Sequence, residues 1–308
     1  MSVLHFLLIM PTHLVPLRDG RRVMEVERCG KEDGEPVWFF HGHPGSAHEV
    51  HVGGFAAEEL GMELFGTSRP GIGQSTYKAG WKVTDFPRDL EDCAAYFGHE
   101  KFSLLGVSGG APFTAVHGVL LEERIKMMTI VSGMAPIQKP GVLNHMRWFN
   151  RQFLTVAQRL PDVFVRFGVW RLLQKFGKVK KGQNVAMREI NKGLPSVDTE
   201  VFNRPEMLEV QRRQLIDASR QGIDGIVQDI CNLARPWGFF LRDAQVPTDL
   251  WHGLEDESVP PQCMQYLAKD MPHARKFWVP GQGHTLLLVN IGDVLREMKS
   301  RIQGLKLG

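Results

Sequence analysis

The sequence predicts an α/β fold in which helices cover both faces of a mostly parallel sheet. Short apolar, strand-like runs alternate with segments of helical spacing through the first 134 residues, an order typical of parallel strands joined by helices. The motif Gly106-Val107-Ser108-Gly109-Gly110 lies where one such run meets a helical segment. This position indicates a serine at a sharp strand-to-helix turn.

Each element is expected from its local pattern. The run at 36–40 is continuously apolar, as in a strand that is buried on both faces. The weak alternation at 23–28 indicates an edge strand, and the apolar spacing at 84–97 is helical. Further strands are expected at 62–65, 102–105, 126–131, 246–251 and 275–279, and further helices at 47–60, from 111 onwards and at 294–303.

Between 135 and 243 the pattern changes, because strand-like runs disappear and helical spacings dominate. Residues 135–245 hold 18 Lys or Arg against 10 Asp or Glu, whereas the whole chain has a formal charge of only +3. We interpret this stretch as a basic helical insertion. Its charge is explained by a solvated surface more readily than by attraction of an anionic substrate.

Composition narrows the class of protein. A chain of 308 residues with 43% hydrophobic content can bury a large core, and its balanced charge gives no argument for nucleic-acid binding. The apolar segment at 3–10 lacks the flanks of a signal peptide, and no run is long enough to cross a bilayer. We expect a cytoplasmic protein without membrane contact. The four cysteines form no C-x-x-C pair and favour a reducing compartment: Cys29, Cys93, Cys231 and Cys263.

Ser108 is the candidate nucleophile. The sharp turn requires residues with almost no side chain two positions before and after it, and Gly106 and Gly110 stand there. The following helix points unpaired N–H groups at the serine, where negative charge develops during acyl transfer. A serine hydroxyl needs a base and an acid that orients this base.

The candidate base is His284, in the glycine-rich loop after the last predicted strand. The candidate acid is Asp256, which follows the preceding strand, with Glu255 and Glu257 flanking it in solvent. Asp249 lies within that strand and can equally be a structural carboxylate. The chain order Ser, Asp, His suits this arrangement.

Two backbone N–H groups are needed to stabilise the oxyanion, and we expect them from Gly109 and His43. His43 also belongs to a group of four histidines that suggests a metal cluster: His41, His43, His48 and His51. No acid or cysteine is placed to complete such a cluster, and glycines interrupt it. The sequence argument therefore favours neither a metal nor a cofactor.

These motifs together resemble the α/β-hydrolase superfamily over nearly the whole chain. The motifs are His41 to Gly45, Arg69 to Ser75, Gly106 to Gly110, Gly253 to Pro260 and Gly283-His284. The resemblance implies an eight-stranded, mostly parallel sheet, with a helical cap inserted after the sixth strand. It divides the chain into a core of residues 1–134 and 244–308 and a cap of residues 135–243. Many relatives carry Asp where this chain has Ser68, a position that supports the loop.

The resemblance also implies hydrolysis through an acyl-enzyme. A serine nucleophile disfavours the haloalkane dehalogenase and epoxide hydrolase branches, which need a carboxylate at this turn. A small carboxylic ester is the leading expectation, on a monomer or homodimer. Carbon–carbon bond hydrolysis, lactonase, aminopeptidase, cofactor-free lyase or peroxidase-like activity and non-enzymatic ligand binding stay open.

The substrate pocket is expected from the cap. Trp148 is a candidate wall, and Arg147 and Arg151 are candidate partners of a substrate carboxylate, although a solvated face explains both arginines better. Other aromatic residues at helical spacing pack within a cap more often than against substrate: Phe149, Phe153, Phe164, Phe167 and Trp170.

Overall fold

The computed structural model describes residues 12–177, 188 and 191–305; the segment at 3–10 lies outside them. Eight strands form one sheet in the order β1-β2-β4-β3-β5-β6-β7-β8. The β1–β2 and β2–β4 pairs are antiparallel and the other pairs are parallel, so the predicted eight-stranded, mostly parallel sheet is confirmed. The strands are β1 (Thr12–Pro16), β2 (Val23–Gly30), β3 (Glu35–Phe40), β4 (Met62–Thr67), β5 (Phe102–Val107), β6 (Ile125–Val131), β7 (Thr248–Gly253) and β8 (Ala274–Val279).

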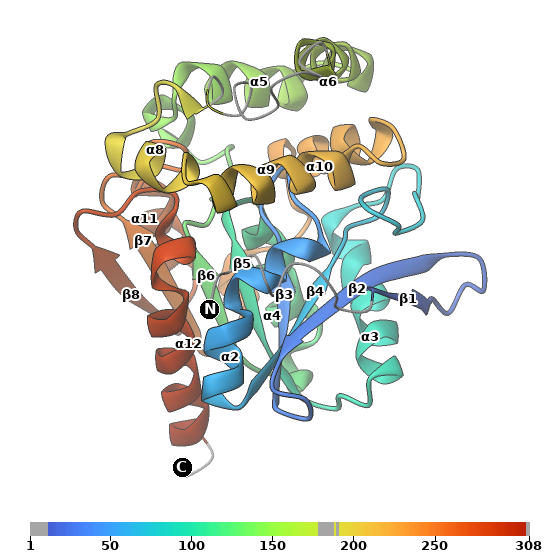
Figure 1. The fold of residues 1–308 in the computed structure, drawn as a ribbon, viewed down its shortest axis with the longest axis vertical. Coiled ribbons are helices and arrows are strands. Elements are labelled where there is room, and N and C mark those ends of the chain that lie inside the picture. Colours follow the sequence, from blue (N-terminus) through green and yellow to red (C-terminus); the bar gives the residue numbers. More distant parts are fainter. Residues whose placement is uncertain (1–11, 178–187, 189–190, 306–308) are drawn as a thin grey trace.

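Helices cover both faces of this sheet (Figure 1). Helices α2 and α12 pack on one face, and α3, α4 and α11 pack on the other. The α-helices are α2 (Gly54–Leu60), α3 (Phe86–Tyr96), α4 (Ala111–Leu120), α5 (Trp148–Arg159), α6 (Asp162–Gly177), α8 (Ser196–Phe202), α9 (Pro205–Ala218), α10 (Asp224–Ala234), α11 (Gln262–Asp270) and α12 (Leu286–Leu305). Short 3₁₀ helices are η1 (Ala47–Gly53), η2 (Val83–Asp85), η3 (Ser108–Gly110), η4 (Glu122–Arg124), η5 (Val142–His145) and η6 (Leu241–Asp243).

The central strand β3 shows why its sequence is continuously apolar. Successive side chains of a strand point to opposite faces. Trp38 and Phe40 accordingly join the core on the α3 and α4 side, whereas Val37 and Phe39 join the core on the α2 and α12 side. All four are fully buried, because helices cover both faces.

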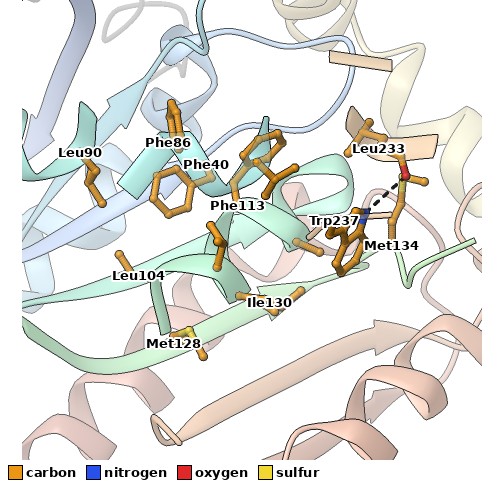
Figure 2. Packing of buried hydrophobic residues seen from close by; sticks show 14 of the residues in the cluster. Phe40, Phe86, Leu90, Leu104, Phe113, Met128, Ile130, Met134, Leu233 and Trp237 are labelled. Carbon is orange, nitrogen blue, oxygen red and sulfur yellow. Dashed lines mark hydrogen bonds between the residues drawn. The ribbon is translucent and has the colours of Figure 1, made fainter. Parts of the chain in front are cut away.

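Figure 2 shows how the end of α10 joins the core on the α3 and α4 side. Leu233 and Trp237, at the end of α10 and just after it, belong to the same buried cluster as Phe40 and Met134. Trp237 Nε1 donates a hydrogen bond to the Leu233 carbonyl at 3.4 Å. Helix α10 therefore packs directly on the core, while α5 and α6 lie farther from the sheet (Figure 1).

Two elements differ from the expectations. The segment at 23–28 is not an edge strand, because the five-residue strand β1 pairs with it and forms the edge instead. Strand β1 has only five residues and ends with Pro16, so its sequence does not show a clear alternation of apolar and polar residues. The last helix begins at Leu286 rather than at 294, with non-helical dihedrals at Asn290. No helix among the described residues is long and apolar enough to span a membrane.

Candidate active site

Ser108 lies at a strained turn directly after β5. Its φ is +52°, in the left-handed region that costs a non-glycine residue about 1–3 kcal/mol. The residue belongs to η3, which leads into α4. The strain lets the chain pass from the sheet into the helix within a few residues, so the serine stands at the carboxyl end of the sheet.

The two glycines of this turn are required by close contacts. A Cβ atom at Gly106 would lie 1.9 Å from Thr114 Oγ1, and one at Gly110 would lie 2.2 Å from the Phe40 carbonyl oxygen. Real Cβ atoms essentially never approach other heavy atoms below 3.0 Å. Any larger residue at either position would therefore displace α4 or β3 and move Ser108.

His284 and Asp256 form a hydrogen-bonded pair. His284 Nδ1 lies 2.8 Å from Asp256 Oδ2. The other oxygen, Asp256 Oδ1, accepts backbone N–H groups from Ser258 and Val259, each at 2.9 Å. These bonds fix the carboxylate, and the carboxylate in turn orients the imidazole with Nε2 available for another partner.

The environment of His284 favours its charged form. Burial lowers the pKa of this imidazole, but the charge and hydrogen bond of Asp256 raise it, and the carboxylates of Asp198 and Glu49 add to that effect. The result is a pKa above the ordinary value of 6.5. An imidazole of this kind can accept a proton near neutral pH.

Ser108 and His284 line one cavity of about 230 Å³. Apolar side chains make up most of the remaining wall. The lining residues are His43, Ser108, Met134, Met146, Asn150, Phe153, Leu154, Ile230, Leu233, Ser258, Val259 and His284. The cavity therefore lies between the carboxyl ends of the strands and the helices that follow β6.

The backbone of His43 lies beside the turn that carries Ser108. A Cβ atom at Gly109 would be 3.3 Å from the His43 backbone nitrogen, and one at Gly42 would be 3.6 Å from Ser108 Cβ. Within the described residues, the His43 N–H donates to no other group. It is free to bind a negatively charged oxygen formed next to Ser108.

The predicted pocket residues do not line this cavity. Trp148 is 74% exposed and Arg151 is exposed, while the Arg147 guanidinium lies against Gly193. Residues of the same segment that do reach the cavity are spaced by about one helical turn: Met146, Asn150, Phe153 and Leu154. Met146 precedes α5. The spacing of the other three places them on one face of α5, with Trp148 and Arg151 on its outer side.

The remaining aromatic candidates divide in the same way. Phe149, Phe164, Phe167 and Trp170 are exposed, and Phe153 is the one that reaches the cavity. Aromatic content by itself did not distinguish the inner face of α5 from its outer one. The position of each residue around the helix axis decides whether its side chain faces the cavity or solvent.

The other acids near Asp256 have different partners. Glu255 Oε1 accepts the Gly281 N–H at 3.0 Å, and Glu257 is exposed. Asp249 is buried and accepts hydrogen bonds from Arg275 and Arg301. Its role is structural, since these two arginines join β7 to β8 and α12.

A buried ion pair that the sequence did not predict supports the His43 loop. Asp229, on α10, accepts hydrogen bonds from Arg69 Nε at 2.6 Å and from Arg69 Nη2 at 2.8 Å. The same guanidinium donates to the His41 and Gly42 carbonyls, each at 2.8 Å. Asp229 also lies 2.6 Å from His43 Nδ1. Burial raises the pKa of Asp229, but Arg69 and His43 lower it overall.

Arg69 was recognisable within the Arg-Pro-Gly motif, but its partner was not. Asp229 is one acid among many in a helical stretch, and 160 positions separate the two residues. The available signal was the helical spacing of apolar residues in this stretch: Ile226, Ile230 and Leu233. That pattern indicates the inner face of a helix but not which cation a carboxylate meets.

Two further buried carboxylates approach the site. Glu49 accepts the Gly42 N–H at 2.8 Å, and its pKa is raised by burial. Asp198, on α8, accepts the Thr285 N–H at 2.8 Å and the Thr285 hydroxyl at 2.9 Å. Asp198 thereby connects a helix of the stretch between β6 and β7 to the loop that carries His284.

The family described as the alpha/beta hydrolase fold matches residues 35–291 of the sequence. No curated protein matches the chain at a significant level. Many solved structures do match it, at identities that establish similarity of fold.

Three of these structures illustrate the range of proteins that share the fold. A thermophilic esterase from Thermogutta terrifontis is 19% identical, with a TM-score of 0.66, and the match covers 96% of this chain and 99% of that one. A bromoperoxidase from Bacillus anthracis is 18% identical, with a TM-score of 0.62 and coverage of 97% and 100%. An alpha/beta hydrolase fold protein from Chitinophaga pinensis is 16% identical, with a TM-score of 0.67 and coverage of 95% and 97%.

Proposed function

Since this chain belongs to the alpha/beta hydrolase family, we propose that it hydrolyses a small, largely apolar carboxylic ester through an acyl-enzyme on Ser108. The observation that carries the proposal is the cavity that Ser108 and His284 share, with His284 bound to Asp256. An activated serine next to an apolar cavity is suited to acyl transfer.

In the first step Ser108 Oγ attacks the ester carbonyl, and His284 Nε2 takes the hydroxyl proton. Asp256 holds the Nδ1–H of His284, which keeps the lone pair on Nε2 and stabilises the imidazolium that forms. The imidazolium then gives its proton to the alcohol oxygen as the carbon–oxygen bond breaks. The alcohol leaves, and the acyl group stays on Ser108.

The negative oxygen of the tetrahedral intermediate is stabilised by the N–H groups of His43 and Gly109. The unpaired His43 N–H and its distance from Gly109 support this role. Each such donor contributes about 3–4 kcal/mol to transition-state stabilisation. Arg69 contributes indirectly, because its bonds to the His41 and Gly42 carbonyls hold the loop in place.

In the second step water replaces the alcohol. His284 removes a proton from the water, the resulting hydroxide attacks the acyl carbon, and the same two N–H groups stabilise the second intermediate. The carbon–Ser108 bond then breaks, and His284 returns the proton to Ser108 Oγ. The carboxylic acid leaves, and the enzyme is restored with no cofactor consumed.

The cavity wall supports a neutral, apolar acyl or alcohol group. None of its described lining residues is Lys, Arg, Asp or Glu, and most are aliphatic, aromatic or Met. A substrate carboxylate would meet no Lys or Arg there, and burying a carboxylate without such a partner costs several kcal/mol. Small neutral esters therefore fit the cavity better than anionic ones.

We also propose that residues 135–243 act as a cap over a core formed by residues 1–134 and 244–308. The five α-helices described between β6 and β7 lie together at one end of the sheet in Figure 1. Side chains from α5 and α10 form part of the cavity wall. On this proposal the cap sets the length and width of the accepted acyl group.

Labelling with a fluorophosphonate tests the proposal. We expect one covalent adduct, located on Ser108 by peptide mass spectrometry and absent from Ser108→Ala. Ser300→Ala, a change at an exposed position of α12, should label like the wild type. A wild-type protein that stays unlabelled, and that hydrolyses none of a series of p-nitrophenyl esters from acetate upwards, would refute the serine hydrolase mechanism.

A further inference from the structure

Two histidines and a glutamate meet outside the cavity of Ser108. His48 Nδ1 lies 3.0 Å from Glu27 Oε2, and His51 Nε2 lies 2.5 Å from the same oxygen. The ligand atoms of the three residues all fall within 4.8 Å of one another. None of the three residues lines the cavity described above, so the cluster is a separate feature of the protein.

The local structure explains why these side chains converge. His48 and His51 are three residues apart on the 3₁₀ helix η1, in which side chains at i and i+3 lie directly above each other. Their ring centroids are 4.9 Å apart. Glu27 belongs to β2, which packs against η1, and it faces both rings.

The charges around the cluster favour a bound cation. Glu27 is only 9% exposed, and a buried carboxylate needs a cation or several donors. The ion-pair partners that the described residues give it are the two imidazoles. Asp217, on α9, adds a second carboxylate close enough to interact with both His48 and Glu27.

From this geometry we infer that Glu27, His48 and His51 bind one divalent transition-metal ion of the zinc type. Two imidazoles and one carboxylate are a donor set that Zn²⁺ accepts, with water in the fourth position. Metal–ligand distances of about 2.0–2.2 Å in a tetrahedral site place the ligand atoms about 3.3 Å apart. The separations of His48 Nδ1 and His51 Nε2 from Glu27 Oε2, 3.0 Å and 2.5 Å, must widen to this value, and all three ligand atoms already lie within 4.8 Å of one another.

The protonation of the two rings permits this binding. The nitrogens that face away from Glu27, His48 Nε2 and His51 Nδ1, are buried and have no hydrogen-bond partner among the described residues. To bind the ion, each ring must move its proton to this outer nitrogen and turn a lone pair inward. The hydrogen bonds from His48 and His51 to Glu27 are then exchanged for bonds to the metal.

The sequence argument against a metal was that no acid or cysteine is placed to complete the histidine cluster and that glycines interrupt it. Glu27 supplies that acid from 21 and 24 positions earlier in the chain. The ion would join η1 to β2, directly after the loop that holds His43. We expect it to stabilise the folded protein, because a ligand that binds only the folded state raises the free energy of unfolding.

Metal binding to the full-length protein tests the inference. After treatment with a chelator and dialysis, isothermal titration with Zn²⁺ should give one tight site per chain, and the melting temperature should rise with Zn²⁺. Glu27→Gln and His51→Asn should each weaken binding at least about tenfold, the loss that follows removal of even an indirect partner of a ligand. His145→Asn, at an exposed position of η5, is the matched control and should bind like the wild type.

Two results would overturn the inference: no tight site in the wild type, or equal binding by the wild type and both cluster variants. If the variants do not fold, X-ray absorption spectroscopy of the Zn²⁺-bound wild type tests the inference instead. The inference requires that the spectrum show two imidazole ligands on the ion. Neither measurement depends on ester hydrolysis. Failure of the proposed function and failure of the metal site are therefore separate outcomes.

Discussion

Arg69 and Asp229 form a solvent-excluded ion pair with two hydrogen bonds, at 2.6 Å and 2.8 Å. Both side chains are 1% exposed. The pair connects the turn after β4 to helix α10, and it also holds the loop of His41, Gly42 and His43. The position of the candidate oxyanion donor thus depends on a residue far from it in the sequence.

The first prediction concerns the loss of this pair. Asp229→Ala leaves the Arg69 charge buried without a counter-charge, so the free energy of unfolding should fall by about 3–5 kcal/mol. Urea denaturation measures the change. Asp293→Ala removes the exposed partner of Arg296 and should cost at most about 1 kcal/mol. Equal effects of the two substitutions would contradict the buried role of Asp229.

The second prediction separates the two glycines of the serine turn. Gly106→Ala should destabilise the protein by about 1–3 kcal/mol, because the added methyl group meets the Thr114 hydroxyl. Adding Thr114→Ala removes that oxygen and should recover most of the loss. Gly110→Ala meets the backbone carbonyl of Phe40, so no substitution at position 114 should rescue it. Thermal unfolding of the four variants provides the comparison.

The third prediction concerns the carboxylate that orients the base. In Asp256→Asn, the Ser258 and Val259 N–H groups still donate to the side-chain oxygen, so the NH₂ group faces His284. The Nδ1 atom of His284 must then accept a hydrogen bond from this NH₂ group. The ring proton therefore moves to Nε2, which cannot act as a base. We expect kcat to fall by a factor of up to ~10⁴, while the free energy of unfolding stays unchanged. Glu255→Gln, at the exposed neighbouring position, should retain activity; a comparable loss there would argue against Asp256.

The fourth prediction follows from the raised pKa of His284. In the proposed mechanism the neutral imidazole is the active base, so kcat/KM should fall as the pH drops through an apparent pKa above 6.5. Asp198→Asn keeps an oxygen for Thr285 but removes a negative charge that favours the imidazolium. The acid limb of the profile should therefore move to lower pH. An unmoved limb would show that Asp198 only supports the loop.

The fifth prediction concerns substrate size. Phe153→Ala widens the cavity and should move the preference towards longer acyl chains by at least about tenfold in kcat/KM, the usual effect of one methylene in an apolar pocket. Arg151→Ala, on the exposed side of α5, should leave the preference unchanged. A p-nitrophenyl ester series measures both. A shift in the Arg151 variant alone would favour a charged substrate.

Much of the sheet was predictable because its signals are local. Continuous apolar runs marked β3 and β5, and the glycines around Ser108 marked the turn. Strand β1 was missed, and its partner β2 was taken as an edge, since a five-residue strand has too few residues to show alternation. Which residues of α5 face the cavity was not predictable, because composition does not specify rotation about the helix axis: Phe153 lines the cavity, whereas Trp148 and Arg151 are exposed.

By itself the sequence determined the alternation of strands and helices and the serine turn, because these depend on side chains within a few residues of one another. It also brought forward His284 and Asp256 through the strands that precede them. Only the tertiary structure decided that Asp229 meets Arg69, that Asp198 reaches Thr285 and that Glu27 meets His48 and His51. Buried charges are stable only when paired, and their partners come from distant segments that pack together as the chain folds.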